Sequence, residues 1–470
     1  MTPATFVRIA PRLVLFAACL TAVDSVVAQG RTGAVPSAQE IAARADEYLT
    51  AAMRFNRFSG SVLLARDGRP LFSKGYGMAN HELGVPNSPE TVFRLGSITK
   101  GFTAAAVMML QERGKLRVDD RICAHLSDCP AAWQPITIRH LLTHTSGITS
   151  FTELPDYPKT MALPVTHESL TARFRDRPLE FSPGEKYKYS NSGYYLLGVI
   201  IERESGRPYA DFLQENIFKP LEMTSSGYDS SRRIIKNRAS GYVTQGEALL
   251  NALPIDMSIP FAAGALTSTV DDLLRWDQAL YTDKLLSRRS LDEMFTPSND
   301  ERGYGWAIRQ RFGRQVIEHD GSINGFTASL SRFPGDRFTV IVLGNNGSFL
   351  TRPIADALSA IVFGVPYDLP QERRAITVDA GTLARYVGQY QVPPDAPLSP
   401  NTVHTVTLEN GRLMRQVNQA PKVELFAESE TVFFMKGSDA QVVFSLDAAG
   451  RVTGLIVRRG GREGTARKVK

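Results

Sequence analysis

The fold is decided by the stretch Phe93-Arg94-Leu95-Gly96-Ser97-Ile98-Thr99-Lys100. It opens an apolar segment that ends just before Gly114, which predicts a helix over residues 97–113. On such a helix Ser97 and Lys100 lie three residues apart on one face, so that the hydroxyl and the amine can touch.

A serine hydroxyl is a poor nucleophile until a base takes its proton. Lysine can be that base only where burial or nearby positive charge lowers its pKa. The start of a helix favours both a neutral amine and a developing alkoxide. A Ser-x-x-Lys tetrad arises by chance about once or twice in a chain this long, and only one occurs here. Ser97 is therefore the candidate nucleophile and Lys100 its candidate base.

Two further motifs could complete such a site. Tyr189-Ser190-Asn191 is the only Tyr-x-Asn of the chain. A phenol near a lysine can be held partly ionised and carry a proton, and the Asn191 amide can hold both Lys100 and a substrate carbonyl. The alternative is a buried tyrosine and an asparagine in a turn.

The second motif is His319-Asp320-Gly321-Ser322, which follows a strand-like segment. A glycine there lets substrate approach the backbone, and the Ser322 amide can join the Ser97 amide in an oxyanion hole. His319 would supply a hydrogen bond or a positive charge, although a lone histidine can equally be structural.

The chain divides into regions of different character. Helical patterns are predicted at residues 40–52 and 353–363, a hairpin at 61–73, and strands at 315–318, 327–333 and 338–343. From about Ile376 short β runs alternate with polar turns, which predicts an antiparallel β module. The expected division is a signal peptide (1–28), a linker (29–39), a main domain (40–370) and a C-terminal β domain (376–470).

The N-terminus has the pattern of an export signal. Arg8 and Arg12 precede an apolar run over 13–23, and small residues end at Ala28. The run is too short for a permanent membrane span, so a periplasmic or secreted location is expected. A lipid anchor at Cys19 is the alternative, but the usual leucine is absent.

Composition narrows the function classes. The chain is 43% hydrophobic and 22% charged, with a net charge of +6 and no Lys/Arg-rich block, which indicates a globular enzyme and no nucleic-acid partner. An oxidising compartment permits a disulfide between Cys123 and Cys129, and two free thiols are the alternative. No Cys/His ligand pattern occurs, so neither a metal nor another cofactor is predicted.

The motifs, in this order, resemble those of the serine β-lactamase-related family, which includes class C β-lactamases, D-alanyl-D-alanine carboxypeptidases and esterases. Four longer phrases carry the resemblance beyond the short motifs, and it covers about residues 40–365. They are residues 93–100, 141–148, 183–198 and 263–269.

The resemblance implies an α+β fold, with an antiparallel sheet flanked by helices, a helical lobe and a small C-terminal antiparallel β domain. It also implies the following roles: Ser97 as acylated nucleophile, Lys100 as base, Tyr189 as second proton carrier, Asn191 as ligand of lysine and substrate, His319 and Gly321 as parts of the substrate-binding strand, and Ser322 as the second oxyanion amide.

One residue departs from the family pattern. His319 stands where class C β-lactamases and many transpeptidases have lysine, and a histidine is mostly neutral at pH 7. Binding of a substrate carboxylate, as in penicillins, is therefore less assured. The expected function is a serine hydrolase acting on an ester or amide of a small molecule or peptide. The alternative is a penicillin-recognising binding or sensor protein that does not turn over.

Overall fold

The computed structural model describes residues 36–246, 248–298, 301–394, 396, 401–420, 422–436, 440–459 and 462–469. The expected signal peptide (1–28), with Cys19, and most of the expected linker lie outside the described residues. None of the helices within those ranges combines the length and apolarity needed to cross a bilayer.

The core of the molecule is a seven-stranded sheet in which every neighbouring pair is antiparallel. This confirms the expected α+β class. Its strands, in spatial order, are β10 (Arg302–Gly303), β11 (Trp306–Arg311), β12 (Arg314–Ile323), β13 (Phe326–Phe333), β14 (Phe338–Gly344), β1 (Gly60–Arg66) and β2 (Arg69–Tyr76).

Helices cover both faces of this sheet, which is why its central strands are buried along their whole length. Val62 and Leu64 of β1 face the layer formed by α1 (Ala38–Arg54) and α11 (Arg352–Phe363). Leu63 and Ala65 face the opposite layer, because successive strand residues point to opposite faces. That second layer contains α2 (Thr99–Glu112), α6 (Asn191–Ser205) and α9 (Val270–Ala279).

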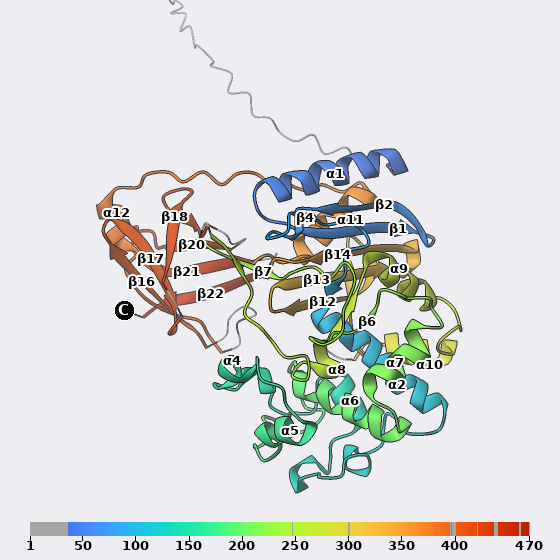
Figure 1. Ribbon diagram of the computed structural model, residues 1–470. Helices are drawn as coiled ribbons and strands as arrows, with labels where there is room; N and C mark the ends of the chain where they lie inside the picture. Colours follow the sequence, from blue (N-terminus) through green and yellow to red (C-terminus); the bar gives the residue numbers. More distant parts are fainter. Residues whose placement is uncertain are drawn as a thin grey trace, which may run out of the picture.

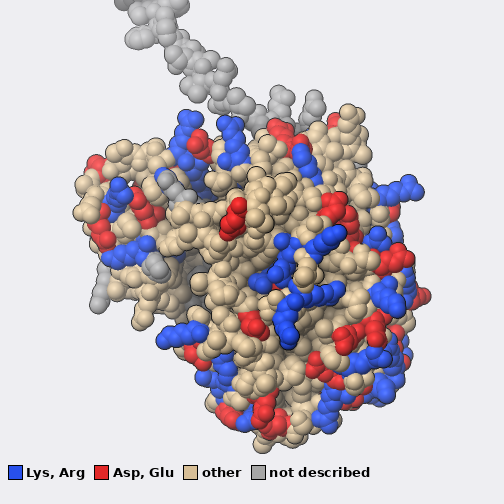
Figure 2. All heavy atoms as spheres, in the orientation of Figure 1, with Lys and Arg blue, Asp and Glu red and all other residues tan. Residues whose placement is uncertain are grey.

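A helical lobe extends the second layer, and Figure 1 shows it at the end of the molecule remote from α1. Positive and negative side chains intermix over its surface (Figure 2). Cys123 and Cys129 lie in this lobe and are paired as a disulfide. The lobe includes α3 (Ile138–Leu142), α4 (Tyr157–Thr160), α5 (His167–Arg175), α7 (Tyr209–Leu213), α8 (Phe261–Gly264) and α10 (Arg288–Phe295).

The helix predicted over 97–113 begins two residues later than expected. Gly96, Ser97 and Ile98 form a 3-10 turn, η1, and the α-helix α2 starts at Thr99. Gly96 has a φ of 53°, a left-handed conformation that glycine adopts without strain. Ser97 therefore lies where the turn meets the helix, and this position leaves the Ser97 hydroxyl accessible.

The C-terminal region is a closed antiparallel barrel of eight strands, which confirms the expected β domain. An extended linker leads from α11 to α12 (Ala380–Arg385) and the barrel, as Figure 1 shows in orange and red. The barrel strands are β15 (Gly388–Gln391), β16 (Val403–Glu409), β17 (Arg412–Val417), β18 (Val423–Ala427), β19 (Val432–Phe434), β20 (Gln441–Leu446), β21 (Val452–Arg459) and β22 (Arg462–Lys468).

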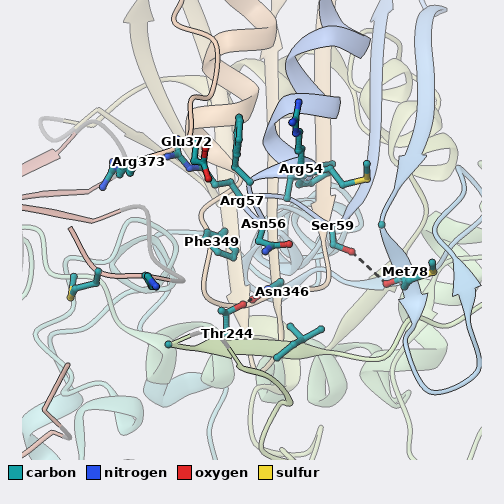
Figure 3. Close-up of a pocket in the computed structure, with 18 of the residues that line it drawn as sticks. Arg54, Asn56, Arg57, Ser59, Met78, Thr244, Asn346, Phe349, Glu372 and Arg373 are labelled. Atoms are coloured by element: carbon teal, nitrogen blue, oxygen red, sulfur yellow. Dashed lines mark hydrogen bonds between the residues drawn. The ribbon is translucent and has the colours of Figure 1, made fainter. Parts of the chain in front are cut away.

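A cavity of about 580 Å³ lies between the barrel and the main domain. Figure 3 shows the end of α1, the loop after β14 and the linker around it. Its walls also include Thr244 on β7 (Tyr242–Gln245), Leu249 on β8 (Ala248–Asn251) and Met435 of the barrel. Val243, the residue before Thr244, lines a different cavity beside Ser97. The β7–β8 ribbon thus separates the two cavities.

Candidate active site

The structure brings together four of the predicted site residues at the start of α2. Lys100 Nζ lies 3.0 Å from Ser97 Oγ and 2.9 Å from Asn191 Oδ1. The Tyr189 hydroxyl donates to Ser97 Oγ at 2.8 Å. Asn191 begins α6 and Tyr189 lies two residues before it, so the end of one loop supplies both groups.

Lys100 is completely buried, and no carboxylate is among the described partners of its amine. Its third partner is the backbone carbonyl of Ala263, at 2.8 Å. Loss of solvent lowers the pKa of Lys100 well below its ordinary value, because nothing negative repays the cost of burying the charge. As a neutral amine, Lys100 can donate to Asn191 and Ala263 and accept the proton of Ser97.

Tyr189 is held as a neutral phenol. Burial raises the pKa of Tyr189, so the partial ionisation expected from the sequence is disfavoured and the hydroxyl is a proton donor toward Ser97. The ring of His144 packs on that of Tyr189, with centroids 4.4 Å apart. His144 Nδ1 also accepts the Ser190 backbone N–H at 3.1 Å, which holds the turn between Tyr189 and Asn191.

Strand β12 presents the predicted oxyanion amide of Ser322. Ile323 and Phe326 flank a two-residue hairpin loop and form a hydrogen-bonded pair, so by alternation Ser322 pairs with Thr327 without ladder hydrogen bonds. The Ser322 N–H therefore points away from β13. On that side β12 pairs with β11 only as far as Glu318. The edge of β12 beyond Glu318, which includes Ser322, is therefore unpaired and faces Ser97.

Gly321 lets the backbone of η1 pack against β12. A Cβ at this position would lie 1.8 Å from the Leu95 carbonyl oxygen and 3.3 Å from the Ser97 nitrogen. The approach of substrate at Gly321 stays a prediction. Gly96 also packs closely against β12, since its Cβ would lie 2.8 Å from the Ser322 nitrogen.

His319 is neutral in this setting. Its Nδ1 lies 2.6 Å from the Asp320 carbonyl oxygen, which a protonated Nδ1 can donate to. Burial lowers the pKa of His319 to about 3. His319 can therefore offer a hydrogen bond from a neutral imidazole, but not the positive charge that a lysine would bring.

A cavity of about 350 Å³ opens beside Ser97 and is lined by Asn191 and Ser322 as well. Three further groups hold the site residues in place, and two of them, Thr152 and the Ala263 carbonyl, were not predicted from the sequence. Thr152 Oγ1 accepts from Asn191 Nδ2 at 3.1 Å, the Ala263 carbonyl anchors Lys100, and His144 supports Tyr189. The role of a backbone carbonyl cannot be predicted from a pattern of side chains. The contacts of Thr152 and His144 join segments that are distant in sequence.

Comparison with known proteins agrees with this geometry. The β-lactamase family model matches residues 45–361. A domain of unknown function, DUF3471, matches residues 372–466, which cover the linker and the barrel.

A penicillin-binding protein of Bacillus subtilis (strain 168) is 32% identical over 428 residues, covering 84% of this chain and 92% of that protein. The octameric penicillin-binding protein homologue from Pyrococcus abyssi superposes with a TM-score of 0.63 at 26% identity, covering 90% of this chain and 99% of the other. A D-stereospecific amidohydrolase from Streptomyces sp. gives a TM-score of 0.54 at 25% identity over 66% and 95% of the two chains. These matches confirm the resemblance seen in the sequence, and the chain belongs to the β-lactamase family of serine hydrolases.

Proposed function

We propose that the protein hydrolyses an ester or amide through an acyl-enzyme on Ser97. The observation that carries the proposal is the environment of Lys100. Its amine is fully buried, meets three neutral oxygens and lies 3.0 Å from the Ser97 hydroxyl. A buried lysine without a counter-ion is a base and not a structural cation.

In the acylation step, Lys100 takes the Ser97 proton while Oγ attacks the substrate carbonyl carbon. The carbonyl oxygen becomes an oxyanion, which accepts hydrogen bonds from the backbone N–H groups of Ser97 and Ser322. The bond to the leaving group then breaks. The leaving alkoxide or amine nitrogen takes a proton from the Tyr189 hydroxyl, and the phenolate so formed takes the proton that Lys100 received from Ser97, since the Lys100 amine lies 4.8 Å from the centre of the Tyr189 ring.

In the second step, water attacks the carbonyl carbon of the Ser97 ester and gives its proton to Tyr189, whose own proton passes to Lys100. The bond to Oγ then breaks, the acid leaves, and Ser97 Oγ takes the proton back from Lys100. Asn191 holds the amine of Lys100 through Oδ1 and itself is held by Thr152. The Asn191 amide is thus fixed before substrate arrives, which lowers the cost of ordering the site.

Because His319 is neutral, it favours binding of a neutral substrate group beside its imidazole over binding of a carboxylate. We therefore place ester or amide hydrolysis ahead of penicillin hydrolysis. The Cys123–Cys129 pair supports action outside the cytoplasm, in the periplasm or after secretion, because such bridges persist in oxidising compartments.

Turnover of nitrophenyl esters, nitrocefin and D-Ala-D-Ala peptides by the wild type and by Ser97→Ala tests the proposal. We expect release of product by the wild type on at least one class and none above background by the variant. Ligand binding without turnover on the whole panel would instead favour a binding or sensor protein.

A further inference from the structure

The cavity beside Ser97 lies on one side of the reacting bond. It is lined by Asn191 and Ser322 but by neither Tyr189 nor His319. In the proposed reaction Tyr189 gives its proton to the leaving group, so the leaving group departs on the Tyr189 side. The cavity is then the place for the acyl part of the substrate, and this step rests on the proposed function.

The described walls of this cavity carry no charge. Sixteen described residues line it, and none is Asp, Glu, Lys, Arg or His. Apolar and aromatic side chains share the walls with uncharged polar ones: Phe151 and Ile255 are buried there, and Val243, Tyr157 and Ile323 are partly buried. A charged group entering such a space would lose its hydration without gaining an ionic partner.

One wall of the cavity is held in place by a hydrogen bond. The Asn324 side chain donates to the Leu253 carbonyl at 2.9 Å. This bond holds the 252–255 segment, which supplies Ile255 to the cavity, against the β12–β13 hairpin.

We propose that this cavity is an acyl subsite for uncharged, apolar acyl groups, and that it discriminates against acyl groups bearing an ammonium or a carboxylate. Acyl groups with a free amine, such as unblocked amino-acyl groups, belong to the class that it rejects. Burial of a methylene contributes about 0.8 kcal/mol, or roughly fourfold in kcat/KM for each methylene that enters the cavity.

Three p-nitrophenyl esters with the same leaving group test the proposal: the hexanoate, the 6-aminohexanoate and the adipate monoester. We expect wild-type kcat/KM for the hexanoate to exceed that for each charged ester by about tenfold or more. We also expect kcat/KM to rise from acetate to hexanoate.

Substitutions on the β7–β8 ribbon supply the matched variants. Val243→Asp places a carboxylate on the wall of the acyl subsite and should raise the ratio of 6-aminohexanoate to hexanoate turnover by about tenfold. Val243→Asn, of the same size but uncharged, should not raise it. Leu249→Asp adds the same charge to the same ribbon but lines the interdomain cavity of Figure 3, and should leave the ratio unchanged.

Equal kcat/KM for the three esters in the wild type, or equal effects of Val243→Asp and Leu249→Asp, would overturn the acyl subsite while leaving the Ser97 mechanism intact. If none of the esters is turned over, the same series is ranked by protection of Ser97 against a fluorophosphonate. Absence of a preference for the hexanoate there also overturns the proposal. Failure of Ser97 to react with any reagent would instead overturn the proposed function.

Discussion

Replacement of Gly321 by alanine should damage catalysis by moving the nucleophile. Gly321 lies on β12 and has no left-handed φ, so the backbone accepts alanine and the conflict is purely steric. The new methyl carbon would lie 1.8 Å from the Leu95 carbonyl oxygen. A carbon–oxygen contact needs about 3.3 Å, so η1 and β12 must separate by about 1.5 Å.

That displacement acts directly on the reacting groups. Leu95 and Ser97 belong to or adjoin η1, and Ser322 follows Gly321, so separation pulls the two oxyanion amides apart. Misplacement by about 1 Å can cost about 100-fold in rate, and overpacking of this kind costs about 1–3 kcal/mol of folding free energy. We expect kcat/KM of Gly321→Ala to fall by about 100-fold or more.

The assay is steady-state hydrolysis of the best ester of the panel, with urea unfolding of the main domain beside it. Gly335→Ala is the matched control, because a Cβ at Gly335 meets no atom within 4 Å. A Gly321→Ala enzyme with wild-type kcat/KM and stability would refute the packing of η1 on β12.

Four more predictions concern titration and stability. Lys100→Met should reduce acylation by about 100- to 10,000-fold, and wild-type kcat/KM should rise with pH along a limb lying below the ordinary lysine pKa of 10.5. His319, with a pKa of about 3, should add no limb between pH 5 and 8, so His319→Gln should keep the shape of the profile. Burial raises the pKa of Asp356 from 3.8 to about 6. The protonated carboxyl of Asp356 therefore stabilises the fold at pH 4, and this stabilisation is lost as the pH rises through 6. The melting temperature of Asp356→Asn relative to wild type should rise from pH 4 to pH 7. Replacing both Cys123 and Cys129 by serine should cost about 2 kcal/mol, since the bridge closes a short loop.

Opposite outcomes are easily recognised. An unchanged acylation rate in Lys100→Met would show that Lys100 is not the base. A limb of the pH profile near pH 6.5 that disappears in His319→Gln would show that the imidazole titrates there. A constant difference in melting temperature for Asp356→Asn across pH 4–7 would contradict the raised pKa. Equal stability of the serine variant in oxidising buffer would show that the bridge contributes nothing.

The main domain could be predicted largely because its signals are local. A continuous apolar run at 62–65 before a tight turn predicts the β1–β2 hairpin, and the run 338–343 is β14 with one further residue at its end. Strand β22 of the barrel lacks such a signal. Arg462–Lys468 has charged residues at most positions and no apolar alternation, and it is a strand because β15 and β21 pair with it.

The site shows the same division. The spacing of Ser97 and Lys100 predicts their contact because one helical turn creates it. Tyr189, Asn191 and Ser322 reach Ser97 through tertiary packing, which only the family resemblance indicated. The packing of η1 against Gly321 was not predicted, since it depends on where the turn lies in space. A mostly neutral His319 was expected from its ordinary pKa, but the burial that lowers this pKa further is a property of the folded chain.

The covalent state of Ser97 is the most direct test of the central claim. Wild type and Ser97→Ala are incubated with a fluorophosphonate and with the hexanoate ester, quenched in acid, and weighed as intact proteins before peptide mapping. We expect one phosphonyl adduct and a transient hexanoyl adduct on wild type, both mapping to the peptide that contains Ser97, and neither on the variant. An adduct that persists in Ser97→Ala, or maps to another residue, would contradict it.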